Sequence, residues 1–108
     1  MAEPRRNTRV AKTAKTKPMD EYGHLQPQAP ELEEAVLGAL MIEKDAYSLV
    51  SEILRPESFY EHRHQLIYAA ITDLAIQQKP IDILTVAEQL RSRGNLEEAG
   101  GPFYITQL

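Results

Sequence analysis

The sequence contains no cysteine and no tryptophan, and its 108 residues include only two phenylalanines. Without cysteine there is no disulfide framework, no thiolate metal ligand and no cysteine nucleophile, which suits a reducing cytoplasm. No apolar run approaches the roughly 20 residues of a membrane span, and residues 1–20 lack the apolar middle of a signal peptide. We therefore expect a cytoplasmic chain with one small domain, because at this length folding buries only about two thirds of the surface.

The sequence also lacks the motifs of nucleotide binding and covalent catalysis. No G-x-x-x-x-G-K-[ST] loop is present, so no run of backbone amides is expected to hold phosphates. The pair Gly100-Gly101 has no lysine close by, and Glu97 and Glu98 before it would repel phosphate. No motif places a nucleophile on a strained turn. We expect no enzymatic activity, no catalytic residue and no cofactor in this chain.

Charge is divided unevenly along the chain. Residues 1–19 carry six Lys or Arg against one Glu, a net +5, whereas residues 20–108 carry six bases against fifteen acids, a net −9. Residues 1–17 hold almost no large apolar side chain, so they cannot bury enough surface to offset the entropy of ordering. We expect a disordered basic tail and extended lead-in over residues 1–26, either simply solvated or in loose contact with DNA phosphates, and a folded domain over residues 27–108.

Capping and helix-breaking residues divide the acidic part into helices. Pro30 fits a first helical position, Asp45 and Asp82 can accept from the free amides of a first turn, and Gly94 can close a helix in the left-handed conformation. The expected helices cover residues 31–43, 46–55, 61–78 and 83–93, with a fifth from 102 onward. No segment shows the alternation of a strand.

The apolar spacing within these helices predicts the buried faces. The residues expected inside are Leu32, Val36, Ala39 and Leu40; Ala46, Leu49, Val50, Ile53 and Leu54; Phe59 and Tyr60; Leu66, Ile67, Ala70, Ile71 and Leu74; and Ile83, Val86, Ala87 and Leu90. Gly38 costs about 1 kcal/mol relative to alanine in a helix, so it marks either close packing by a neighbouring element or a tolerated incidental glycine. The expected fold is all-α, a compact orthogonal bundle of four to five short helices.

Glu61, His62 and His64 invite a metal-binding interpretation. Residues at i and i+2 lie on nearly opposite sides of a helix, whereas helical ligand pairs need i, i+3 or i, i+4. We therefore expect no metal site, and His64 is expected to bond to backbone at a helix start. Glu33 and Glu34 are expected on a solvated helix face, without acid–base catalysis.

A DNA-binding regulator is the alternative function. Residues 85–94 resemble one half of a helix-turn-helix, and the basic tail could serve as an arm on DNA. That motif needs a second, recognition helix after a short turn. Here the following residues, 96–101, are acidic and broken by two glycines, and the net charge of the body opposes the phosphate field.

Four groups of short motifs follow one another between residues 25 and 108. They are Pro27, Glu31, Glu33 and Val36-Leu37-Gly38; Pro56-Glu-x-Phe-Tyr60 with His64-Gln65; Pro80-Ile-Asp82 with Thr85-Val86, Glu88 and Leu90; and Leu96-Glu97-Glu98 with Gly100-Gly101 before Tyr104. In this order and spacing they resemble the N-terminal domain of the DnaB-type replicative DNA helicases, although Pro30, Leu32 and Glu34 depart from that pattern. Each motif alone is weak, whereas the set is specific.

The resemblance implies a collar domain of a hexameric ring that docks primase and couples DNA unwinding to primer synthesis during replication. In that family a helical hairpin follows this region, and a separate C-terminal motor uses ATP and magnesium and grips single-stranded DNA. The implied partners are the primase C-terminal domain, other helicase subunits and a helicase loader, at the replication fork in the cytoplasm. Tyr104, the aromatic after the glycine pair, is the implied partner-binding residue, together with Phe103 and Ile105; the alternative is that all three pack the fifth helix.

Overall fold

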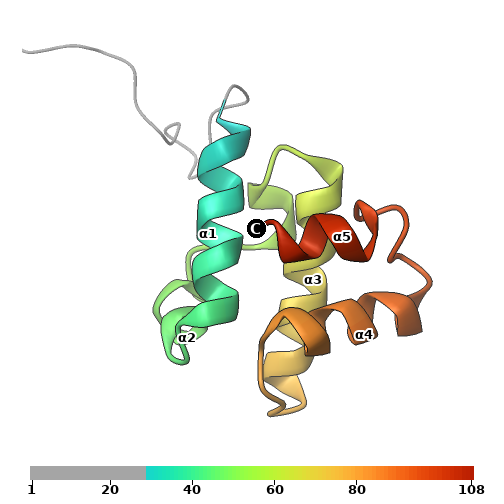
Figure 1. The fold of residues 1–108 in the computed structure, drawn as a ribbon. Helices are drawn as coiled ribbons and strands as arrows, with labels where there is room; N and C mark the ends of the chain where they lie inside the picture. The colour runs from blue at the N-terminus through green and yellow to red at the C-terminus, as the bar shows by residue number, and fades with distance from the viewer. Residues whose placement is uncertain (1–28) are drawn as a thin grey trace, which may run out of the picture.

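The computed structural model describes residues 29–108, and there the chain forms helices and no β-strand (Figure 1). The elements are α1 (Pro30–Ile42), α2 (Ala46–Val50), the short 3₁₀ helix η1 (Pro56–Ser58), α3 (His62–Ile76), α4 (Ile83–Arg93) and α5 (Gly101–Thr106). α1 packs beside α3, while α4 and α5 run across them (Figure 1). The predicted all-α orthogonal bundle is therefore confirmed. The tail predicted over residues 1–26 lies outside the described residues.

The observed helix ends match the predicted ones where the capping residue makes its bond. The Asp82 carboxylate accepts from the Thr85 amide at 2.8 Å, and the Asp82 amide donates to the Thr85 hydroxyl at 2.9 Å, so α4 begins as expected. Gly94 closes α4 with a φ of +76°. Asp45 is different, because its side chain makes no capping bond and α2 ends well before the predicted Arg55. None of the helices described in residues 29–108 is long and apolar enough to cross a membrane.

The core lies where α1, α3, α4 and α5 meet. Its apolar residues are Leu37, Leu40, Met41, Leu54, Phe59, Ile67, Tyr68, Ala70, Ile71, Leu74, Val86, Leu90, Ala99 and Ile105. The Tyr68 ring packs on Phe59 and Tyr47 at centroid distances of 5.2 and 6.1 Å, and its hydroxyl donates to the Leu54 carbonyl at 3.0 Å. Burial, with a smaller contribution from Tyr47, raises the pKa of Tyr68 to about 12. The phenol therefore remains a hydrogen-bond donor inside the core.

The buried face of α1 is rotated from the predicted one. Leu32 and Ala39 are exposed, whereas Glu33 and Leu37 are fully buried. The prediction placed only apolar residues inside, but this helix turns a glutamate inward because the surrounding backbone satisfies its carboxylate. The predicted solvated position of Glu33 is therefore wrong.

Four further apolar residues predicted inside are exposed. Leu49, Ile53, Tyr60 and Ile83 have exposed fractions of 79%, 68%, 60% and 41%. The short α2 packs through Tyr47, and the chain turns at residues 51–53, so Ile53 does not keep the helical spacing on which its prediction depended.

Gly38 lies against the last described residue of the chain. A Cβ atom at this position would be 2.9 Å from the backbone carbonyl carbon of Leu108, closer than real Cβ contacts occur. Close packing by a neighbouring element, one of the two readings of this glycine, is therefore confirmed.

Candidate functional site

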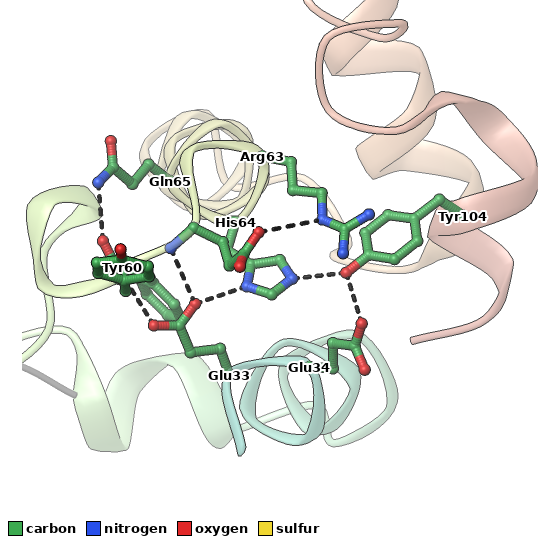
Figure 2. Close-up of polar contacts among 9 residues, drawn as sticks. Glu33, Glu34, Tyr60, Arg63, His64, Gln65 and Tyr104 are labelled. Carbon is green, nitrogen blue, oxygen red and sulfur yellow. Dashed lines mark hydrogen bonds and ion pairs between the residues drawn. The ribbon is translucent and has the colours of Figure 1, made fainter. Parts of the chain in front are cut away.

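A buried carboxylate joins α1 to the start of α3 (Figure 2). Glu33 is fully buried, and its Oε2 accepts from the Tyr60 amide at 2.6 Å. Its Oε1 accepts from the Glu61 amide at 3.3 Å and lies 2.6 Å from His64 Nδ1. Because amides at the amino end of a helix are otherwise unpaired and carry partial positive charge, an anion is favoured here. Glu33 thus caps α3 from another helix.

His64 continues this network towards α5. Its ring is fully buried, and its Nε2 lies 2.6 Å from the Tyr104 hydroxyl. That hydroxyl also bonds Glu34 Oε2 at 2.8 Å, so the series returns to α1 (Figure 2). We call these four residues, Glu33, His64, Tyr104 and Glu34, the polar network. His64 was expected to bond to the backbone. Its two ring nitrogens instead pair with the side chains of Glu33 and Tyr104.

The polar network needs one proton more than its groups carry when the imidazole is neutral and both glutamates are ionised. Its three bonds, at 2.6, 2.6 and 2.8 Å, each require one proton. A neutral imidazole supplies one and the phenol supplies one. All three bonds therefore exist together only when an additional proton resides in the network.

The Tyr104 hydroxyl forms two hydrogen bonds, and the Tyr104 ring contacts a third side chain. Burial raises the pKa of the Tyr104 hydroxyl well above its ordinary value, and the hydrogen bond to Glu34 raises it further. The Arg63 guanidinium lies 4.1 Å from the ring centroid, in the geometry of a cation–π contact. The Arg63 Nε is 3.6 Å from Glu61 Oε1 (Figure 2). The phenol therefore stays protonated and bridges α3 and α1.

The arrangement of the polar network is that of a structural junction. Glu33 and His64 have no exposed surface, so a substrate in solution cannot reach either group. The network joins three helices that are distant in sequence, since Tyr104 and Glu34 are 70 residues apart. A hydrogen-bonded network of this kind fixes the relative position of its elements when every member is satisfied.

The structure separates the three predicted partner-binding residues. Phe103 is 74% exposed, whereas Ile105 is fully buried in the core. The partner contact predicted for Ile105 therefore needs correction, because its side chain faces the interior. Tyr104 is partly buried and its hydroxyl is already paired, so the alternative of a packing role holds for much of this side chain. Binding by Phe103 and Tyr104 stays a prediction.

Sequence reasoning missed Glu33 and His64 as members of one site. The signal was present in their spacing: Glu33 precedes Leu37 by four residues, and His64 precedes Ile67 and Tyr68 by three and four. Such spacing puts each polar residue on the buried face of its helix. No metal-binding group of three or more suitable side chains occurs in residues 29–108.

The helix-turn-helix alternative finds no support in the described geometry. The segment after α4 contains the acidic residues Glu97 and Glu98, and the helix that follows, α5, has six residues and no basic side chain. A recognition helix needs side chains that reach base edges and phosphates. α5 instead contributes Ile105 to the core and Tyr104 to the polar network.

Substituting Tyr104 with Phe tests the polar network. The ring remains, but the hydroxyl that bridges His64 and Glu34 is lost, so we expect the free energy of unfolding to fall by about 1–3 kcal/mol. Tyr60→Phe is the matched control, since this tyrosine is largely exposed, and its expected change is below about 0.5 kcal/mol. Chemical denaturation followed by circular dichroism measures both. Equal stability of the two variants would show that the bridging bonds contribute nothing.

Comparison with known proteins places this arrangement in a family. Residues 25–108 match the DnaB-like helicase N terminal domain. The chain is 51% identical over 86 residues to the replicative DNA helicase DnaB of Rhodothermus marinus, covering 80% of this chain and 9% of that protein. It is 43% identical over 84 residues to the replicative DNA helicase DnaC of Bacillus subtilis (strain 168), covering 78% of this chain and 18% of that protein. The chain thus spans less than a fifth of either relative.

A solved structure has the same fold. The crystal structure of the N-terminal domain of DnaB helicase from Mycobacterium tuberculosis superposes with a TM-score of 0.72 at 43% sequence identity, covering 75% of this chain and 58% of that one. The family match includes every element described here, from α1 to α5. This chain therefore belongs to the DnaB-like helicase N-terminal domain family.

Proposed function

We propose that this chain is the collar domain of a hexameric replicative helicase, and that its α5 surface docks the C-terminal domain of primase. Docking would couple DNA unwinding to primer synthesis at the replication fork in the cytoplasm. In this proposal the chain itself catalyses no reaction, and ATP hydrolysis, with its magnesium, belongs to a separate motor domain of the helicase. Contacts with other helicase subunits and with a helicase loader are further parts of the proposal.

The observation that carries the docking proposal is the pairing of an exposed aromatic side chain with a fixed one on α5. Phe103 exposes 74% of its surface, and Tyr104 beside it is held by the polar network and by Arg63. Aromatic anchors contribute much of the binding energy in protein interfaces because they bury a large area at low entropic cost. A rigid neighbour further lowers the entropy that is lost on binding.

Phe103→Ala provides the test. We expect it to weaken binding of the primase C-terminal domain by at least about 1 kcal/mol, the threshold for a contributing interface residue. Its melting temperature should stay close to that of the unsubstituted chain, because the side chain packs little against the core. Isothermal titration calorimetry with this 108-residue chain measures the affinity.

The matched control is Leu49→Ala on α2, where the leucine is 79% exposed. This variant also loses an exposed apolar side chain, but far along the chain from α5, so its affinity for primase should be unchanged. Tyr104→Ala is unsuitable as the primary test, because loss of its hydrogen bonds would alter the fold's stability as well. Primase binding that is unaffected by Phe103→Ala, or equally weakened by Leu49→Ala, would contradict docking through α5.

A further inference from the structure

A groove of about 540 Å³ lies between the end of α1 and the connection from α3 to α4. Its apolar lining comes from both sides: Met41 and Ile42 from α1, and Pro80 and Ile81 from the connection. Ile42 is 76% exposed, which leaves apolar surface open to solvent. The volume is within the range of about 300–1,000 Å³ found for small-molecule sites, and it can receive one or two peptide side chains.

Two lysines make the groove positive in an otherwise acidic domain. Residues 29–108 carry thirteen acids against six bases, a net −7. Three of these bases, Arg63, Arg91 and Arg93, form ion pairs with described carboxylates. Lys44 and Lys79 both line the groove and make no ion pair with another residue of the described range. Their ammonium groups are therefore available to a ligand with negative charge.

The lining itself holds more positive than negative charge. Asp82 is its one acidic residue, and its Oδ1 accepts the hydrogen bond that caps α4, at 2.8 Å from the Thr85 amide. Glu43 and Asp45 flank Lys44 in sequence, and both are exposed outside the lining. The groove lining thus holds two positive charges against one carboxylate.

The backbone at the rim adopts a conformation that is uncommon for its residue. Gln78, two residues after the end of α3, has a φ of +59°, and the Lys79 amide donates to the Leu74 carbonyl at 2.9 Å. This is the closing turn in which glycine is usual, and a side chain there costs about 1 kcal/mol. Gln78 and Lys79, which are adjacent in sequence, both line the groove at this turn.

We propose that this groove binds an acidic peptide segment of a protein partner, with an apolar side chain on Met41 and Ile81 and flanking carboxylates beside Lys44 and Lys79. The apolar lining favours a peptide, because a nucleic acid would place phosphates against it. The groove is formed at the carboxyl end of α1, whereas the polar network is formed at its amino end, so this proposal does not depend on primase docking through α5.

The test uses a fluorescent peptide in which two leucines are flanked on each side by aspartate and glutamate, and a matched peptide with asparagine and glutamine instead. Each is titrated against the 108-residue chain by fluorescence anisotropy and by amide NMR. We expect only the acidic peptide to bind and to shift the amides of residues 41–44 and 78–82. Lys79→Glu and Lys44→Glu should each weaken it about fivefold or more, because the reversal replaces attraction by repulsion.

Arg55→Glu is the matched control, because it makes the same change in charge on an exposed residue outside this groove. It should change the affinity less than about twofold. Equal weakening by all three reversals would reduce the binding to general attraction, and equal binding of the neutral peptide would remove the role of the carboxylates. Displacement by a single-stranded oligonucleotide would favour nucleic acid instead. If the chain self-associated in sedimentation and Lys79→Glu abolished this, the occupant would be a second copy of the chain. If no amide shifted at high peptide concentration, the proposal would be wrong.

Discussion

Glu33→Ala is expected to lower the free energy of unfolding by about 3–5 kcal/mol, because each of the polar groups that it leaves unpaired costs about 1–3 kcal/mol. The substitution leaves the Tyr60 and Glu61 amides without their acceptor and the buried His64 ring without its partner. Unpaired polar groups in a protein interior retain the full cost of losing water. Because a small domain has only about 5–15 kcal/mol of stability, this variant should be close to unfolding. Urea denaturation followed by circular dichroism measures the change.

Glu31→Ala is the matched control for this prediction. It removes the same side chain from the same helix, but Glu31 is exposed in the first turn of α1. We expect it to lower the free energy of unfolding by no more than about 1 kcal/mol, the value of a favourable charge near a helix amino end. If both variants unfolded at the same urea concentration, the buried carboxylate would contribute no more than a surface charge does.

Stability is expected to fall as the pH rises above 10, because Tyr68 and Tyr104 both have pKa values above the ordinary 10.0. A group whose pKa is raised by folding keeps its proton in the native state when the unfolded chain has already released it. Its contribution is therefore complete below pH 10 and is lost as the pH rises through the folded value, about 12 for Tyr68. Linkage gives a slope of about 1.4 kcal/mol per pH unit for each tyrosine in this window.

Urea denaturation at several pH values between about 10 and 12 measures this slope. Tyr68→Phe should lower it by about half, since one of the two tyrosines is then absent. Tyr60→Phe should leave the slope unchanged, because its hydroxyl makes no part of the core or the polar network. An unfolding free energy that stays constant over this pH range would show that neither phenol is protected by the fold.

The sequence predicted the architecture because helix limits depend on local chemistry. Asp82 and Gly94 act within one turn of their own position, so propensity and capping rules located both ends of α4. The apolar face of α3 was likewise predicted, with Ile67 and Ile71 fully buried. The helix at residue 46 was predicted, but its early end at Val50 was not, because that end depends on packing with α1 and α3, which no local pattern contains.

The polar network could be predicted only in part. The apolar spacing could place Glu33 and His64 on buried faces, but not the partners that make the burial of Glu33 favourable, which are backbone amides 27 and 28 residues away. The compensating groups become neighbours only after α1 and α3 have packed. The groove had no sequence signal either, since Lys44 and Lys79 are 35 residues apart. A site whose residues are distant in the sequence can be identified only from the three-dimensional structure.

The contact between Gly38 and Leu108 determines how closely the end of the described chain approaches the first helix. The backbone of Leu108 rests on the middle of α1, where a Cβ atom would not fit, and the carboxyl end of the described chain lies beside that helix (Figure 1). A side chain at position 38 would therefore push the backbone at residue 108 away from α1.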